Sequence, residues 1–171
     1  MDITINNQRE VRSFEIEPGK RVEEFDVRAS QLVSIQELNF KPAKTYLYNS
    51  EIKSCRFIKG EFTDGVIDRV EWRDCDLTGV SFYDSKIASC EFNICKLGSS
   101  NWRNTTIRKL TISGSDLREA DFSGSDIKDL DIRGCRIEAI KIPTDMYKYI
   151  TIDRTQAIYF ASLSGLNIKD L

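Results

Sequence analysis

Large apolar residues recur at every fifth position through most of the chain. The series is unbroken over twenty positions: Leu47, Ile52, Phe57, Phe62, Ile67, Trp72, Leu77, Phe82, Ile87, Phe92, Leu97, Trp102, Ile107, Ile112, Leu117, Phe122, Ile127, Ile132, Ile137 and Ile142. Neither the period of an α-helix nor the two-residue alternation of a β-strand produces this spacing. A smaller residue, such as Ser50, Cys55 or Gly60, stands two positions before most of them. We expect both positions of each pentad to point into a core.

A strict short period indicates one structural unit that is repeated and stacked, because five residues cannot bury their own apolar face. The pentads at 115–129, Ser-Asp-Leu-Arg-Glu, Ala-Asp-Phe-Ser-Gly and Ser-Asp-Ile-Lys-Asp, resemble the pentapeptide-repeat family. The resemblance implies an all-β solenoid, a right-handed quadrilateral β-helix with one pentad per side and about 20 residues per coil. Two columns at that spacing agree with it, an aromatic column and an isoleucine column: Phe62, Phe82, Trp102 and Phe122; Ile67, Ile87, Ile107 and Ile127.

The repeat divides the chain into three segments. Residues 1–24 do not keep the phase, and alternation around Ile3, Ile5, Phe14 and Ile16 before Pro18 predicts a short hairpin or strand pair that caps the first coil. A partner site in the same place is the alternative. We expect the β-helix over 25–142, regular from 45, and a C-terminal cap and dimerisation segment over 143–171.

The C-terminal segment predicts one short α-helix after Pro143. Asp153 is a suitable N-cap, Gln156 stands at the capping-box position, and Gly165 ends the apolar run. Residues 152–157 and 164–168 resemble the C-terminal segment of the DNA-mimic branch of the family, in which this segment pairs two subunits. Because the run is apolar on more than one side, we expect a two-fold homodimer whose interface contains Ile158, Tyr159, Phe160, Leu163, Leu166 and Ile168.

Composition excludes several classes of protein. The net charge of −2 gives no overall attraction to nucleic acid or to an anionic membrane. The N-terminus has no apolar signal region and no stretch is long enough to span a membrane, so we expect a cytoplasmic protein. All five cysteines occupy the small inward position of a pentad, where buried thiols acting as small apolar groups are favoured over disulfides: Cys55, Cys75, Cys90, Cys95 and Cys135.

Nothing in the sequence predicts catalysis, a metal site or a cofactor. The chain has no histidine, no Cys-x-x-Cys pair, no phosphate-binding glycine loop and no nucleophile elbow. A rod filled by its own side chains offers no cavity for a substrate. We therefore expect a protein that is not an enzyme and that acts through its surface.

Carboxylates follow two faces of the expected rod. One face aligns Glu51, Glu71, Glu91 and Asp131, and the adjoining face adds Glu61, Asp64, Asp84 and Asp121. Like charges at a strand spacing of about 4.8 Å repel, so the first row needs either a function or counter-charges. Lys53, Arg73 and Arg133 stand two residues after members of that row and can supply counter-charges, which leaves an ion-paired ladder as the alternative.

Two functions follow. The resemblance implies a DNA mimic whose acidic faces bind a type II topoisomerase such as DNA gyrase and protect it from quinolones, without direct contact to nucleic acid. The alternative is a structural or protein-interaction scaffold with no topoisomerase activity. The weak net charge argues against the first.

Overall fold

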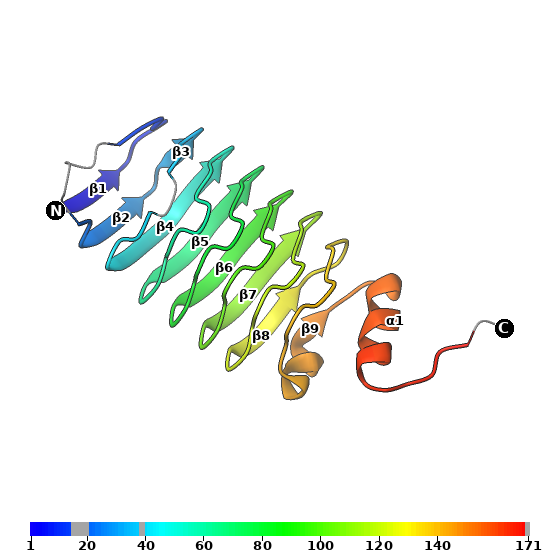
Figure 1. Cartoon of the computed structure of the whole chain (residues 1–171). Helices are drawn as coiled ribbons and strands as arrows, with labels where there is room; N and C mark the ends of the chain where they lie inside the picture. The colour runs from blue at the N-terminus through cyan, green and yellow to red at the C-terminus, as the bar shows by residue number, and fades with distance from the viewer. Residues whose placement is uncertain (15–20, 38–39, 170–171) are drawn as a thin grey trace.

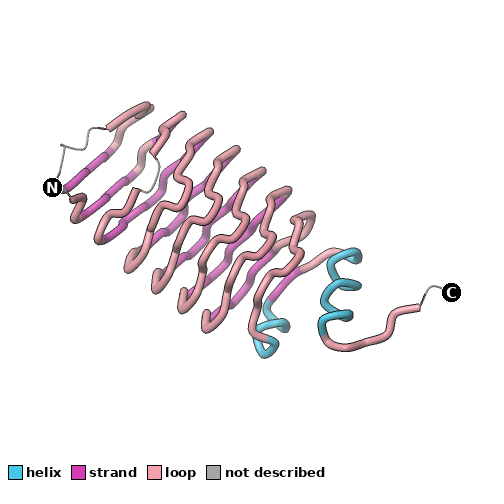
Figure 2. Tube along the Cα trace, viewed as in Figure 1, coloured by secondary structure: helices cyan, strands magenta, loops and turns pink. Residues whose placement is uncertain are grey.

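The chain folds into a rod of stacked parallel strands with two short helices at its C-terminal end (Figures 1 and 2). The computed structural model describes residues 1–14, 21–37 and 40–169. One sheet contains all the strands: β1 (Asp2–Asn6), β2 (Glu24–Arg28), β3 (Gln31–Val33), β4 (Lys44–Lys53), β5 (Val66–Arg73), β6 (Lys86–Asn93), β7 (Thr106–Ser113), β8 (Asp126–Asp131) and β9 (Ile150–Thr151). The helices are the 3-10 helix η1 (Thr144–Tyr149) and α1 (Arg154–Leu163). The predicted solenoid with one short C-terminal α-helix is confirmed.

The strand register confirms a coil of 20 residues. Ile67 pairs with Ile87, Ile87 with Ile107, and Ile107 with Ile127. In the aromatic column, ring centroids lie 5.9 Å apart for Phe62 and Phe82 and 5.2 Å apart for Trp102 and Phe122. All twenty residues of the five-residue series are buried. The inward assignment of the large apolar position is therefore correct throughout the repeat.

The corners of the rod follow the same five-residue period as the core positions. From Asn49 to Ala139 every fifth residue has a positive φ, which turns the chain from one side to the next. With five residues per side and 20 per coil, the rod has four sides. Most of these corner residues are Asn, Asp, Ser or Gly, the residues that tolerate the left-handed region.

The small inward position fills the space beside each large residue. A Cβ on Gly65 would overlap the carbonyl oxygen of Thr45 in the preceding coil, so the two coils approach closely only because glycine stands there. The five cysteines occupy equivalent buried positions and are all free thiols. Burial raises the pKa of Cys90 and of Cys135 to about 11, so both remain protonated at neutral pH. The interpretation of the cysteines as small packing groups is confirmed.

The two tryptophans differ in the pairing of their indole N–H groups. Trp102 Nε1 donates to Ser100 Oγ at 2.7 Å, whereas Trp72 Nε1 is buried without a partner among the described residues. Val70 stands two residues before Trp72, and the corresponding residue two positions before Trp102 is Ser100. The difference follows from one residue type at an otherwise equivalent site.

We expect Trp72→Phe to cost less stability than Trp102→Phe, by about 2 kcal/mol. Both variants lose similar apolar volume, but the first removes an unpaired buried donor and the second leaves the buried Ser100 hydroxyl without its bond. Urea unfolding of the two variants measures the difference directly. Equal losses would contradict it.

The prediction that residues around Ile3 and Ile5 form a hairpin or strand pair with those around Phe14 is wrong within the described residues. Strand β1 pairs in parallel with β2, placing Ile3 beside Phe25 and Ile5 beside Val27, and Val11 forms a parallel bridge with Leu32. The chain therefore winds in the solenoid direction from its first strand, because Ile3 and Ile5 stack on the apolar residues of the next coil. Ile16 and Pro18, on which the hairpin partly rested, lie outside the described residues.

The stack also continues past Pro143. After η1, the strand β9 pairs with β8 in the same 20-residue register, with Ile150 beside Leu130 and Thr151 beside Asp131. Helix α1 follows, with Asp153 as N-cap and a complete capping box with Gln156, as predicted. The helix therefore begins where one side of the rod has received its last strand.

Candidate partner-binding surfaces

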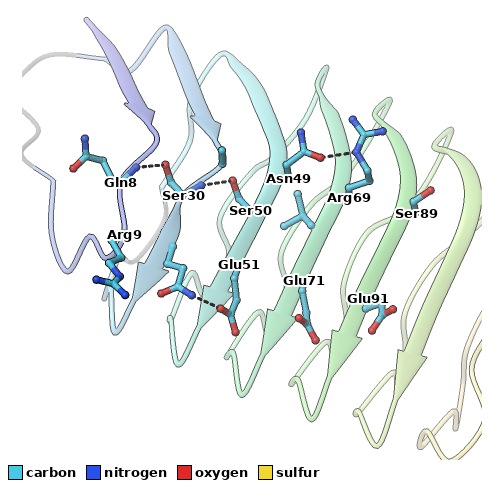
Figure 3. A pocket seen from close by; sticks show the side chains of 13 residues that line it. Gln8, Arg9, Ser30, Asn49, Ser50, Glu51, Arg69, Glu71, Ser89 and Glu91 are labelled. Carbon is cyan, nitrogen blue, oxygen red and sulfur yellow. Dashed lines mark hydrogen bonds between the residues drawn. The ribbon is translucent and has the colours of Figure 1, made fainter.

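The predicted carboxylate row exists as an aligned row on one side of the rod. The register places Glu51 beside Glu71, Glu71 beside Glu91, and Thr111 beside both Glu91 and Asp131. Figure 3 shows Glu51, Glu71 and Glu91 on three successive strands, pointing to the same side. The 20-residue coil was sufficient to predict this alignment.

Arginines pair with three of the four carboxylates in the row. Arg73 lies 2.5 Å from Glu71 and 3.7 Å from Glu51, and Arg133 holds Asp131 with a two-point contact of 3.0 and 2.7 Å. The bonds from Arg133 lower the pKa of Asp131, so this carboxylate stays charged together with its partner. Arg73 and Arg133 are two of the three counter-charges expected from the sequence. These pairs make the ion-paired ladder the better description of this part of the row.

The adjoining side likewise contains both ion-paired and unpaired carboxylates. Lys41 pairs with Glu61 at 2.5 Å and Lys141 with Asp121 at 3.8 Å. Of the eight predicted carboxylates, three form no ion pair within the described part of the chain: Asp64, Asp84 and Glu91. Asp64 and Asp84 occupy equivalent corners, with φ of 50° and 57°. Among the eight predicted carboxylates, the free negative charge is therefore at these three residues.

The next side of the rod along the chain, after the side that carries Glu91, has a ladder of alternating charges that the sequence did not lead us to predict. Its members alternate in sign from one coil to the next and are joined by parallel bridges: Arg56, Asp76, Lys96, Asp116 and Arg136. Lys96 lies 3.3 Å from Asp76, and Arg136 lies 3.8 Å from Asp116. Reading the sequence at a 20-residue spacing would have found the alternation. Because adjacent charges cancel, this side presents little net field to a charged partner.

An open groove of about 650 Å³ runs beside the carboxylate row (Figure 3). Glu51, Glu71 and Glu91 line one wall, and Asn49 and Arg69 line the other, where Arg69 Nε donates to Asn49 Oδ1. The buried hydroxyls of Ser30 and Ser50 in this groove donate to the backbone carbonyls of Arg28 and Tyr48. The sequence did not predict this groove, which is open and lined largely by polar and charged side chains.

Helix α1 is tied to the end of the rod by side chains that complete the exposed strand edge. Gln156 Nε2 donates to the carbonyls of Ile132 and Cys135 at 2.7 and 2.9 Å, and Asp153 accepts the N–H of Gly134. Tyr159 Oη accepts the N–H of Ala139 at 2.7 Å. These bonds satisfy backbone groups that the next coil would otherwise satisfy. The helix therefore terminates the stack.

The six residues predicted for a dimer interface fall into two groups. Phe160 is only 9% exposed and packs against Tyr147, and Tyr159 is half-buried by its contact with the last coil. Ile158, Leu163, Leu166 and Ile168 are 48–63% exposed. Two of the six are thus used within the subunit, and four remain exposed in its C-terminal segment; we call these four residues the terminal patch.

Other classes of site are not found in the described residues. No group of three or more Cys, Asp or Glu side chains lies close enough to hold a metal ion within residues 1–14, 21–37 and 40–169. Neither helix in that part of the chain has the length and apolar composition needed to cross a membrane.

Comparison with known proteins identifies the repeat. The family model for pentapeptide repeats matches residues 89–124 and 103–138. The chain contains pentapeptide repeats, and its fold is the pentapeptide-repeat β-helix. No curated protein sequence matches the chain.

Several solved structures are similar in outline. A trypsin-treated form of QnrB1, a plasmid-mediated fluoroquinolone resistance protein, is 14% identical, with 98% of this chain and 97% of that chain covered and a TM-score of 0.42. Full-length QnrB1 is 12% identical, with 97% and 100% covered and a TM-score of 0.36. HetL, a pentapeptide repeat protein involved in heterocyst differentiation regulation from Nostoc sp. strain PCC 7120, is 10% identical, with 80% and 84% covered and a TM-score of 0.26. At these values the similarity says nothing about partner or activity.

Proposed function

We propose that this chain is a non-catalytic rod that binds another protein through its outer surface. The proposal is supported by a core filled with buried apolar side chains and by a groove whose hydroxyls are engaged by the backbone. Histidine is absent from the sequence, and burial raises the pKa of the Cys90 and Cys135 thiols to about 11, so these two do not act as thiolate nucleophiles at neutral pH. A cytoplasmic location fits five cysteines that form no disulfide.

The terminal patch supports a homodimer as the functional unit. Four exposed apolar side chains belong to the C-terminal segment at one end of the rod, and two-fold pairing of that end would remove apolar surface from water. In this arrangement residues 143–171 serve both as the cap of one subunit and as its interface. The N-terminal coil, over 1–24, is left as the cap of the opposite end.

We expect the double variant Leu163→Glu, Leu166→Glu to be monomeric, because carboxylates cannot be buried against their own copies. Sedimentation over a concentration series would show a dimer for the unsubstituted chain and a monomer for the variant. Lys169→Glu, a charge change at an exposed residue next to the patch, is the control and should remain dimeric. If the unsubstituted chain is itself a monomer, the proposed homodimer is wrong.

The specific partner that we propose is the DNA-binding surface of a type II topoisomerase such as DNA gyrase, with the rod acting as a DNA mimic. The observation that carries this step is the set of three carboxylates without counter-ions, Asp64, Asp84 and Glu91. A basic surface made for phosphates would supply their missing counter-charges. The resemblance of residues 152–157 and 164–168 to the DNA-mimic branch agrees with it. Because five of the eight carboxylates are already paired, we expect moderate binding that weakens steeply with salt.

A gyrase supercoiling assay with and without a fluoroquinolone tests the partner. The unsubstituted rod should inhibit supercoiling or protect the enzyme from the drug, and Asp84→Lys, Glu91→Lys should abolish the effect. Glu119→Lys, Glu138→Lys makes the same change in charge on another part of the rod and should retain it. Loss in both variants would indicate net charge alone. No effect of the unsubstituted protein would favour the scaffold with a different partner.

A further inference from the structure

One residue of the rod breaks the rule that governs its corners. Ile94 has a φ of +56°, and it is the only β-branched residue among the positive-φ positions of the described chain. The left-handed region is most unfavourable for β-branched side chains, whereas Asn, Asp, Ser and Gly occupy most of the other corners. The local conformation therefore gives no reason for isoleucine at this position.

Packing within the subunit gives no reason either. Ile94 is 68% exposed, the largest exposed fraction of any large apolar residue in the described chain. The residue at the same corner one coil later is Gly114, and a Cβ there would lie 3.8 Å from Ile94 Cγ1, so no side chain covers the isoleucine from that direction. A single exposed apolar residue is ordinary, but one that is also held in an unfavourable conformation calls for a compensating contact outside the chain.

The charges around Ile94 indicate the chemistry of that contact. Asp74 occupies the same corner one coil earlier, and Glu91 precedes Ile94 on the outward row of β6. Neither carboxylate forms an ion pair within the described residues, and two neighbouring cations pair elsewhere: Arg73 with Glu71 and Glu51, and Lys96 with Asp76. An apolar side chain one coil from Asp74 and three residues after Glu91 matches a surface with an apolar recess bordered by Lys or Arg side chains.

We propose that Ile94 is the apolar anchor of the rod's protein contact and that its partner is a basic protein surface with an apolar recess. The proposal rests on the proposed function, because the topoisomerase surface is basic and the carboxylates invoked include Glu91. It adds a residue that charge matching alone would not select. Binding to such a surface would combine salt-dependent attraction by Asp74 and Glu91 with a salt-independent apolar contact.

Three variants separate the anchor from the fold. Ile94→Asn removes the apolar side chain and introduces a residue suited to positive φ, so the melting temperature should rise by about 2–4 °C. Its binding to purified DNA gyrase, measured by surface plasmon resonance, should weaken by about tenfold or more. Ile94→Leu keeps an apolar side chain without β-branching and should retain binding. Ser54→Asn makes the corresponding change at the same corner two coils away, and should leave binding unchanged.

Each outcome has a defined meaning. Unchanged gyrase binding by Ile94→Asn overturns the anchor while leaving the proposed function in place. No binding by the unsubstituted rod overturns the proposed partner and the anchor with it. Dissociation of the dimer by Ile94→Asn in sedimentation would also overturn the proposal, because the isoleucine would then be covered by a second copy of the chain.

Discussion

Replacing Leu97 by aspartate is expected to unfold the rod. Leu97 is completely buried in the centre of the stack, between Leu77 and Leu117 of the neighbouring coils. A carboxylate there would have no counter-ion and no water, which costs more than about 4 kcal/mol. Since each coil contacts only its neighbours, a break at this level also separates the two halves of the stack.

Circular dichroism during heating would measure this effect. We expect Leu97→Asp to lose the cooperative β-sheet transition, whereas Leu97→Met, which conserves volume, should cost less than about 1.5 kcal/mol. A melting temperature for Leu97→Asp equal to that of the unsubstituted protein would contradict the inward assignment of the whole pentad series, because Leu97 is a typical member of it.

The five-residue pattern predicts the core because every pentad meets the same constraint. Large side chains such as Leu97 and Trp102 must face inward, and once the coil length is known the pairing of Glu51 with Glu71 follows by addition. The same addition would have found the alternating ladder from Arg56 to Arg136. Long-range order in a solenoid is thus encoded locally, which is unusual among folds dominated by non-local strand pairs.

The pattern fails where the coil length changes. Strand β1 pairs with β2 at a spacing of 22 residues, as Asp2 beside Glu24 shows, so Ile3 and Ile5 carried no pentad phase and were assigned to a hairpin. At the other end, η1 separates Ile142 from β9, and the return of Ile150 to the register depends on the geometry of that helix. In both places the sequence shows alternating or apolar residues, but it does not indicate which strand they pair with.

The sequence predicted only in part which carboxylates of the candidate site form ion pairs. Arg73 and Arg133 were expected as counter-charges because they stand two residues after Glu71 and Asp131. Which carboxylates remain free depends on the side-chain positions of cations in other coils, such as Lys141 beside Asp121. The unusual backbone of Ile94 was likewise hidden, because the repeat alone did not establish that every fifth residue adopts a positive φ.

Replacing Gln156 by leucine is expected to release helix α1 from the rod. The side-chain amide of Gln156 is 4% exposed and donates to two backbone carbonyls, those of Ile132 and Cys135, while its oxygen accepts the N–H of Asp153. Leucine fills a similar volume but makes none of these bonds. The carbonyl of Cys135 and the N–H of Asp153 then lose their partners, and the carbonyl of Ile132 keeps only the N–H of Cys135. At about 1–3 kcal/mol for each unpaired group, we expect a loss of roughly 3 kcal/mol or more.

Hydrogen exchange can locate this loss, because two amides report on the docking of α1. The N–H groups of Gly134 and Ala139 are bonded to Asp153 and Tyr159 of the cap, so Gln156→Leu should speed their exchange and leave the amide of Leu97 protected. The control Ser162→Ala alters an exposed hydroxyl of the same helix and should change neither rate. Undocking would also uncover the edge of the last coil, and unpaired strand edges associate with one another. We therefore expect Gln156→Leu to form assemblies larger than a dimer. If the amides of Gly134 and Ala139 exchange at the same rates as in the unsubstituted chain, the helix is held instead by Phe160 and its apolar neighbours.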